Sequence, residues 1–314
     1  MTCHNCRTEC QSIGKHRNGL RRFRCKQCRK SFTEPHENVL NGMYLPLDKA
    51  EAVLKMLLEG NSVSSVERIT EVHHATILKL LVLAGEKCER IMAEKIRNVE
   101  VRDVECDELW SFIGKKQKRV RPEDDQNLGD AYTFVAIERH SKLVLNIAMG
   151  KRDQYTTNAF VEGIRHATSR LAFQITTDGF APYKSAITTT LHDRLTGFAQ
   201  LIKVYRAASE GEGRYSPAEV ASVETVPVFG QPDPERICTS IVERSNLSTR
   251  MGLRRFTRLT NAFSKKWENH WAAIACWFTF YNFCRVHKSL RVTPAMAAGI
   301  SDHIWSVREL LEAA

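Results

Sequence analysis

Two cysteine pairs near the N-terminus constrain this chain more than any other feature. Cys3 and Cys6 form one Cys-x-x-Cys pair, Cys25 and Cys28 form another, and 18 residues separate the pairs. Each pair can form a tight turn that points two thiolates at one ion, and two such turns complete a tetrahedral site. The spacing predicts a zinc ribbon over residues 1–40, in which structural Zn²⁺ folds a segment too small to bury its own core. Cys10 or His16 could replace one of the four ligands.

The same segment is strongly basic. Residues 1–40 contain nine Lys and Arg against three Asp and Glu, a surplus of six within the formal net charge of +10 of the whole chain. Basic proteins commonly bind a polyanion, and nucleic acid is the usual one. We expect Arg21, Arg22 and Arg24 to contact phosphates. A solvated charged face is the alternative interpretation of this cluster.

Residues 45–97 have the pattern of a small helical domain. Apolar spacing predicts helices over 47–58, 62–69 and 73–84, followed by a basic helix over 88–97. A tight turn around residues 70–72 suits a DNA-binding helix-turn-helix, with His73, Thr76 and Lys79 free to enter a groove. A helical packing module would show the same spacing.

From residue 98 onward the pattern changes to strands mixed with helices. Strands are predicted at 99–113, 132–138, 143–150 and 173–177, and helices at 156–170, from 185 and from 239 onward. Residues 203–237 show no period, and we interpret them as an insertion or a long irregular connection. The sequence therefore predicts an α/β domain over 98–314. The longest apolar run is shorter than the ~20 residues of a membrane-spanning helix, so no membrane partner is expected.

Three acidic residues stand at positions suited to a metal site. Asp107 lies inside a predicted strand, Asp178 ends another, and Glu243 opens a helix. Acidic residues are depleted in strands, so Asp107 needs a reason to be there. Carboxylate oxygens are preferred ligands of Mg²⁺ and Mn²⁺, and two such ions ~4 Å apart can promote phosphoryl transfer. For each residue alone, a surface acid or a salt-bridge partner is the alternative.

Several sequence blocks resemble a known family. The chain resembles bacterial insertion-sequence transposases with a DDE catalytic domain, in particular the family of the first-numbered insertion sequence. The blocks that carry the resemblance occur in the family's order and lie at 23–32, 75–78, 107–110, 177–183, 242–247 and 262–266. The resemblance implies an RNase H-like fold in which Asp107 lies on the central strand, Asp178 follows the fourth strand and Glu243 lies on a late helix.

The resemblance also implies an activity and its partners. The expected reaction is cleavage of double-stranded DNA at transposon ends and joining of those ends to target DNA, by at least a dimer. A bacterial cytoplasmic location at the nucleoid is expected, which agrees with clustered cysteines in a chain that starts without a signal peptide.

The chain is rich in basic residues after Glu243. A phosphate backbone that enters a carboxylate site needs positive charge around it, and we expect DNA contacts from these residues. The candidates are Arg244, Asn246, Arg250, Arg254, Arg255, Arg258, Lys265 and Lys266. A solvated helix face is the alternative for any single arginine.

Three functions remain in competition at this point. The first is an active transposase, the second a DNA-binding regulator without catalytic activity, and the third a nuclease of the same fold that cuts without joining. The presence of Asp107, Asp178 and Glu243 argues against the regulator. The sequence does not separate the first function from the third.

Overall fold

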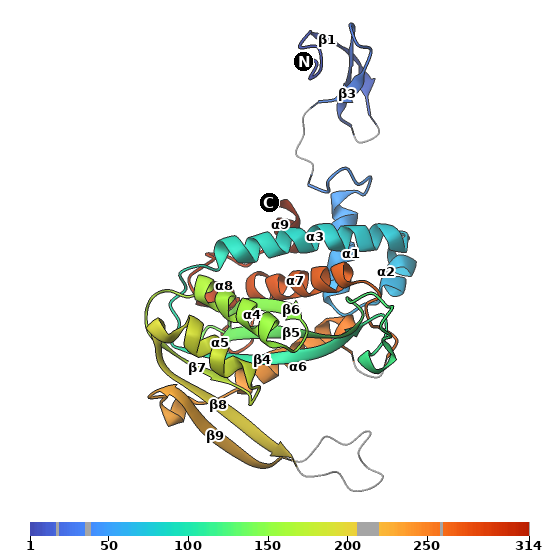
Figure 1. Ribbon diagram of the computed structural model, residues 1–314. Coiled ribbons are helices and arrows are strands. Elements are labelled where there is room, and N and C mark those ends of the chain that lie inside the picture. The colour runs from blue at the N-terminus through green and yellow to red at the C-terminus, as the bar shows by residue number, and fades with distance from the viewer. Residues whose placement is uncertain (17–18, 35–38, 206–219, 258–259, 314) are drawn as a thin grey trace. The chain divides into compact units, whose positions relative to one another are not determined.

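The chain divides into two compact units. The computed structural model describes all residues except 17–18, 35–38, 206–219, 258–259 and 314 (Figure 1). The units are Met1–Asp48 and Lys49–Ala314, and the boundary falls in the first turn of helix α1 (Leu47–Leu58).

The first unit is a small antiparallel sheet. Strands β1 (Cys10–Lys15), β2 (Arg21–Cys25) and β3 (Ser31–Thr33) pair in the order β1-β2-β3. Among the described residues of this unit, the buried apolar side chains are Cys3, Cys25 and Leu40. So little buried surface cannot offset the entropy of ordering the chain, and small domains of this kind need a metal or disulfide to fold.

The second unit is built on a six-stranded mixed sheet, so the predicted α/β class is confirmed. The strands are β4 (Asp103–Ile113), β5 (Gly129–Glu138), β6 (Val144–Gly150), β7 (Phe173–Thr177), β8 (Leu195–Tyr205) and β9 (Val220–Gly230). Their order is β6-β5-β4-β7-β8-β9. Strand β4 pairs antiparallel with β5 and parallel with β7, and β7 pairs parallel with β8. Strand β4 therefore lies at the centre, buried on both faces.

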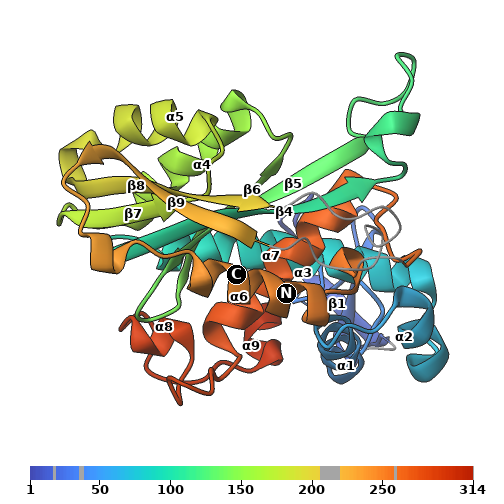
Figure 2. The same ribbon diagram turned by 90° about the horizontal axis from the view of Figure 1, so that it is seen from below.

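Helices cover both faces of this sheet (Figure 2). Helices α4 (Gln154–Ala167) and α5 (Pro182–Thr190) lie on one face, while α6 (Ser240–Gly252) and α7 (Trp267–Phe283) lie on the other. The second unit also contains α8 (Pro294–Ala297), α9 (Val307–Glu312) and the short η1 (Gln117–Arg119), η2 (His192–Arg194), η3 (Pro234–Arg236) and η4 (Arg254–Phe256). None of the helices in the described residues has the length and apolarity required to cross a bilayer.

The helices of the predicted helix-turn-helix segment belong to the second unit. Helix α1 has the predicted bounds, and α2 (Val63–Thr70) is capped by the Ser62 hydroxyl, which accepts from the Ser65 amide. The prediction of separate helices over 73–84 and 88–97 is wrong, because α3 runs unbroken over His74–Lys95. Gly85 does not end the helix. It lets α3 approach α7 closely, since a Cβ at this position would lie 2.5 Å from Ala272.

The prediction of an irregular connection over 203–237 is also wrong for its described part. Strand β8 extends to Tyr205, and β9 pairs with it antiparallel from Val220 to Gly230. Strand β9 is an edge strand whose side chains are mostly exposed on both faces. An edge strand without a buried face lacks the alternation by which strands are detected in sequence. Residues 206–219 lie outside the described residues.

A buried histidine joins helix α7 to the central strand. The imidazole of His270 is fully buried, with Nε2 2.9 Å from Ser111 Oγ and Nδ1 2.6 Å from Ser264 Oγ. The Ser111 hydroxyl donates to the Ala131 carbonyl, and Arg255 donates to Ser264 Oγ. This pattern fits a neutral imidazole that donates from Nε2. Burial, together with the nearby Arg255 charge, lowers the pKa of His270 to about 3.

This histidine should make the fold sensitive to acid. Because the folded-state pKa lies below the unfolded value of about 6.5, the unfolded chain takes up the proton first as the pH falls. The contribution to stability is constant above about pH 6.5 and decreases below it, by about 2 kcal/mol at pH 5. Urea unfolding at pH 7 and pH 5 should show a change in stability that is about 2 kcal/mol less favourable in the wild type than in His270→Gln, because all other titrating groups are common to both proteins. Equal pH dependence in the two proteins would rule out His270 as the source.

Candidate active site

The three predicted carboxylates line one cleft in the second unit. Its volume is about 600 Å³, and Asp107, Asp178 and Glu243 all lie in its wall. Parallel pairing of β4 with β7 aligns Cys106 with Thr177. Asp107 and Asp178, which directly follow these two residues, therefore lie side by side. Glu243 comes from the first turns of α6. Three segments distant in sequence thus meet at the end of the central strands.

Asp107 is held by two hydrogen bonds. Its Oδ1 accepts from the Glu108 amide at 2.8 Å, and its Oδ2 accepts from the side-chain amide of Asn246 at 2.7 Å. Burial, with a contribution from the charges of Asp178 and Glu243, raises the pKa of Asp107 to about 6. A carboxylate in this position is costly to ionise without a neighbouring positive charge.

Asp178 is fixed by the turn that follows β7. Its Oδ1 accepts from the Phe180 amide at 3.0 Å, and Oδ2 lies 3.4 Å from Arg152 Nη2. The backbone carbonyl of Asp178 accepts from Gln200 on β8 at 2.8 Å. Burial raises the pKa of Asp178 above its ordinary value. The side chain is therefore oriented before anything binds.

Glu108 is a fourth carboxylate that the sequence analysis missed. Carboxylate oxygens of Asp107, Glu108 and Asp178 all lie within 4.8 Å of one another. The Glu108 side chain is only 3% exposed, and Oε2 accepts from Arg152 Nε at 3.0 Å. Burial raises the pKa of Glu108 to about 7, and Asp178 contributes to this rise. The signal was a second acidic residue next to Asp107 in the same buried strand.

Glu243 lies in the same cleft but outside that tight group. Its Oε1 accepts from the Thr239 hydroxyl at 2.6 Å and forms an ion pair with Lys203 of β8. The Glu243 side chain is 41% exposed, much more than Glu108. The cleft wall thus carries Asp107, Asp178 and Glu243, with Arg152 and Lys203 as cationic partners. Glu108 lies next to the two aspartates but is not among the residues that line the cleft.

Glu105 attaches the helix of Glu243 to the central strand. Glu105 is 1% exposed, and its Oε2 accepts from the backbone amides of Ile241 and Val242 at 2.8 and 3.0 Å. These amides belong to the first turn of α6, whose N–H groups have no partner within the helix. A carboxylate at a helix N-terminus is favourable, and here it determines where α6 meets the sheet.

The predicted DNA-contacting residues of the second unit lie in different environments. The buried side-chain amide of Asn246 donates to Asp107, and Arg255 donates to Ser264 Oγ at 2.7 Å. Both side chains therefore form hydrogen bonds within the protein. Arg250 lines the cleft. Arg244, Lys265, Lys266, His73 and Lys79 are exposed, Arg254 and Thr76 are half-buried, and Arg258 lies outside the described residues. His73 also caps helix α3 by accepting from the Ala75 amide.

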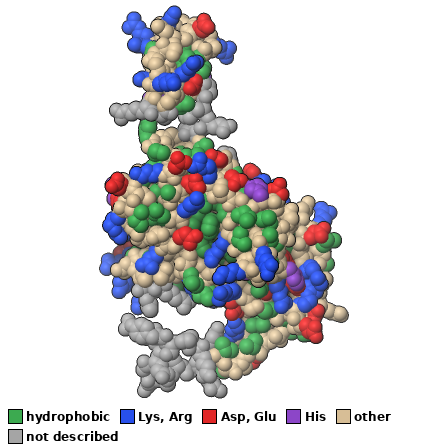
Figure 3. Space-filling model, turned by 180° about the vertical axis from the view of Figure 1, so that it is seen from behind, with side chains coloured by type: hydrophobic (Ala, Val, Ile, Leu, Met, Phe, Trp, Pro, Cys, Tyr) green, Lys and Arg blue, Asp and Glu red, His purple; other side chains and the backbone are tan. Residues whose placement is uncertain are grey.

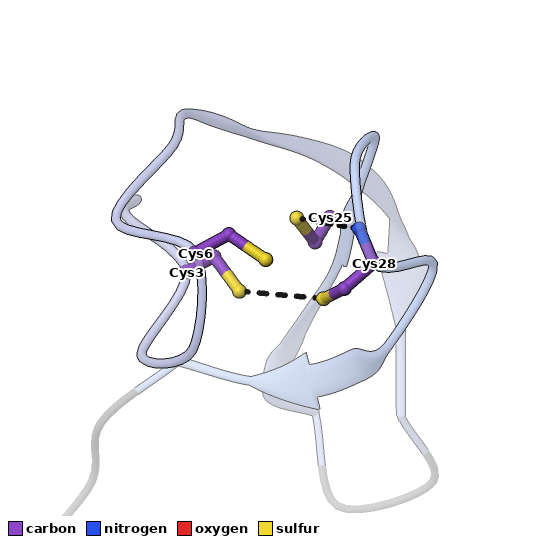
Figure 4. Close-up of side chains that lie close together, drawn as sticks. All are labelled: Cys3, Cys6, Cys25 and Cys28. Atoms are coloured by element: carbon purple, nitrogen blue, oxygen red, sulfur yellow. Dashed lines mark hydrogen bonds between the residues drawn. The ribbon is translucent and has the colours of Figure 1, made fainter.

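The four predicted cysteines gather in the first unit (Figure 4). A sulfur from each of Cys3, Cys6, Cys25 and Cys28 lies within 4.8 Å of the others, and the Sγ atoms of Cys3 and Cys28 are 3.7 Å apart. Cys10 and His16 are not part of this group. Both pairs form the same turn: the Arg7 amide donates to the Cys3 carbonyl, and the Arg29 amide donates to the Cys25 carbonyl. A hydrogen bond from the Thr8 hydroxyl, followed by the Cys28 amide, lowers the pKa of Cys25 to about 6.

The basic side chains predicted in the first unit lie on its surface. Arg21, Arg22 and Arg24 are all exposed. Lys and Arg side chains are spread over the visible face of this unit (Figure 3). The three arginines are available to a ligand in solution.

Comparison with known proteins gives only distant similarities. No family model matches the chain, and no curated protein matches it. The piggyBac transposase synaptic complex with hairpin DNA is 11% identical with a TM-score of 0.38, over 88% of this chain and 72% of that chain. The Mos1 transposase paired-end complex with left transposon end is 12% identical with a TM-score of 0.20, over 51% of this chain and 59% of that chain. Similarities this low define no family, and the proposals below rest on the residues of this chain.

Removal of Glu105 should loosen helix α6. Glu105→Ala leaves two buried amides of α6 without an acceptor, which should lower the free energy of unfolding by about 1–3 kcal/mol. Glu105→Gln retains one acceptor oxygen and loses only the charge, so its cost should be about 1 kcal/mol or less. Urea unfolding of both variants at pH 8 measures the difference. An alanine variant as stable as the wild type would show that these bonds do not hold α6.

Proposed function

We propose that this chain is a metal-dependent DNA transposase that cleaves the ends of a mobile element and joins them to target DNA. The observation that carries the proposal is the cleft itself, in which adjacent parallel strands bring Asp107 and Asp178 together and α6 adds Glu243. These are the three residues for which the sequence blocks predict catalysis. These three residues are far apart in the sequence, so their meeting in one cleft is a product of the fold.

The topology supports an RNase H-like fold for the second unit. Strand β4 is the first strand of its sheet in chain order and lies at the centre, while β7 is the fourth. Asp107 is on β4, Asp178 follows β7, and Glu243 is on a helix near the end of the chain. This is the arrangement expected of that fold. Strand β9 extends the sheet beyond it.

The donor atoms suit Mg²⁺ or Mn²⁺. Carboxylate oxygens are the ligands that these ions prefer, and three carboxylates within 4.8 Å are costly to keep ionised without a cation. Asp107, Asp178 and Glu243 would hold the ions, with Glu108 beneath them. When bound, two such ions activate the attacking oxygen and stabilise the leaving oxygen of the phosphodiester.

The remaining residues of the cleft would position the DNA. Asn246 orients Asp107, and the Phe180 amide orients Asp178. Arg152, Lys203 and Arg250 line the cleft beside the carboxylates. Their positive charges would attract the phosphates of a strand and offset its repulsion from the acidic residues. The chain thus binds and orients the backbone.

We further propose that the other predicted segments hold the DNA ends. The cysteine cluster fits structural Zn²⁺, and the exposed arginines of the first unit would contact phosphates. Helix α3, with exposed His73 and Lys79 near its start, would act as the recognition helix. Cutting two ends together requires at least a dimer, and the reaction would take place at the bacterial nucleoid.

Substitution of the carboxylates tests the activity. Asp107→Asn, Asp178→Asn and Glu243→Gln should each slow Mg²⁺-dependent cleavage about a thousandfold, or about 4 kcal/mol of lost transition-state stabilisation. DNA binding should remain largely intact. The substrate is DNA that carries the inverted repeats flanking the coding region. Asp302→Asn removes an exposed acid outside the cleft and serves as the control. Normal turnover by Asp107→Asn would remove the proposed site.

Two other functions give different results in the same assay. A nuclease of this fold would cut the repeat-bearing DNA and leave the ends unjoined, so insertion of a donor fragment into a plasmid identifies the transposase. A DNA-binding regulator would bind the repeats and cut nothing. The close group of Asp107, Glu108 and Asp178 disfavours a regulator, because partial burial of these carboxylates has a cost that DNA binding does not require.

Loss of zinc should unfold the first unit alone. Chelation or Cys25→Ser should remove the signal of residues 1–40 from the circular dichroism spectrum and weaken DNA binding, because the small core cannot fold the segment by itself. Cys10→Ser is the matched control, since this thiol lies in the same unit but outside the cluster. Zinc content should fall in the first variant and not in the second. An unchanged spectrum and affinity after chelation would contradict the zinc site.

A further inference from the structure

A second pocket lies along the same central strand as the carboxylates. Its volume is about 620 Å³, and the aromatic side chains of Trp110, Phe112 and Phe263 form part of its wall. All three are half-buried, so their faces are partly open. Trp110 follows Asp107 by three residues, which is about 10 Å along the strand, and its side chain shares the face of β4 that carries Glu108. The pocket is therefore close to the proposed site of cleavage.

The aromatic side chains form one continuous row. The ring centroids of Trp110 and Phe112 are 5.8 Å apart, and those of Phe112 and Phe263 are 4.8 Å apart with stacked planes. The backbone keeps this row in place, because Ser264 bridges to Ile113 and the Gly114 amide donates to the Ser264 carbonyl at 2.8 Å. Such a row offers the faces of several aromatic rings, tilted by 38° between Trp110 and Phe112 and by 29° between Phe112 and Phe263, to a planar ligand.

The pocket is also strongly positive. Five of the side chains that line it are Lys or Arg, and none of its described lining residues is acidic. The Lys116 ammonium lies 6.0 Å from the ring centroids of both Trp110 and Phe112. Lys118 and Arg119 are exposed on the short helix η1. A ligand of this pocket should carry both a planar apolar group and a negative charge.

A hydrogen bond joins a residue of this pocket to a residue of the catalytic cleft. Thr257 lines the pocket, and its hydroxyl donates to the carbonyl of Arg250 at 3.5 Å. Arg250 in turn lines the cleft of Asp107 and Asp178. A DNA strand that occupies the cleft would therefore pass near the aromatic row.

We propose that this pocket binds an unpaired nucleotide of the DNA, with its base against Trp110 and Phe112 and its phosphate near Lys116. The inference rests on the proposed function, because it requires that the chain binds DNA at the cleft. Inside a duplex both faces of each base are covered by neighbouring bases, whereas an unpaired nucleotide can offer a face of its base to an aromatic side chain. The pocket volume lies within the range of about 300–1,000 Å³ usual for ligand sites.

The binding test compares two DNA probes on the full chain. One is a labelled duplex with blunt ends, and the other is the same duplex with a short single-stranded thymidine overhang, both without Mg²⁺ or Mn²⁺. The wild type should bind the overhang probe about tenfold more tightly, which is the expected effect of stacking one base. Trp110→Ala should reduce this preference to about twofold or less, while Trp110→Phe should retain most of it.

Two control variants separate stacking from charge and folding. Trp271→Ala removes another half-buried tryptophan, which lies outside the pocket, and should keep the full preference. Lys116→Ala should weaken binding of both probes and reduce the salt dependence by about one phosphate contact. Full overhang preference in a folded Trp110→Ala variant would overturn the proposal.

Photocrosslinking of the wild-type chain gives an answer that does not depend on how variants fold. An overhang with iodouracil in place of thymine should form adducts with Trp110, Phe112 or Phe263, identified by mass spectrometry. Adducts confined to other residues, or equal binding of the two probes by the wild type, would overturn the pocket while leaving the proposed function in place. Failure to bind either probe at low salt would instead overturn the proposed function, and the pocket with it.

Discussion

Mutual repulsion between acidic side chains is the constraint on which the second unit depends. Parallel pairing of β4 with β7 puts Asp107 beside Asp178, and Glu108 lies within 4.8 Å of both. Burial makes each charge more costly, as the raised pKa values of these side chains show. The fold offsets this cost locally. Arg152 bridges Glu108 and Asp178, and backbone amides donate to both aspartates.

The surrounding elements maintain this arrangement. Glu105 holds the start of α6 by accepting hydrogen bonds from two of its backbone amides. Helix α6 in turn supplies Asn246 to Asp107 and Glu243 to the cleft. His270 holds α7 to β4 through Ser111. Both contacts join buried polar groups by hydrogen bonds, which gives the helices specific positions on the sheet rather than a merely apolar contact. Misplacement of either helix would alter the cleft.

Part of this site could be predicted from the sequence and part could not. Asp107 stood out as an acid in a buried strand, and Asp178 as an acid directly after another strand. Glu108 is also an acidic residue in a buried strand, but the motif around Asp107 drew attention to Asp107 alone. Arg152 and Lys203 gave no signal, since each meets its acidic partner only through the fold. Nothing in the sequence indicated that Arg255 donates a hydrogen bond to Ser264, since the two side chains meet only through the fold.

The two faces of β4 make different contacts, and this limits where residues can be inserted into the chain. Glu105, Asp107 and Ser111 contact α6 and α7, while Glu108 contacts Arg152 on the opposite face. Side chains alternate along a strand, so one inserted residue would exchange the two faces. Insertions in natural variants or engineered chains should therefore be tolerated at the tip of the β4–β5 hairpin, within residues 121–127, and excluded from the strand before it.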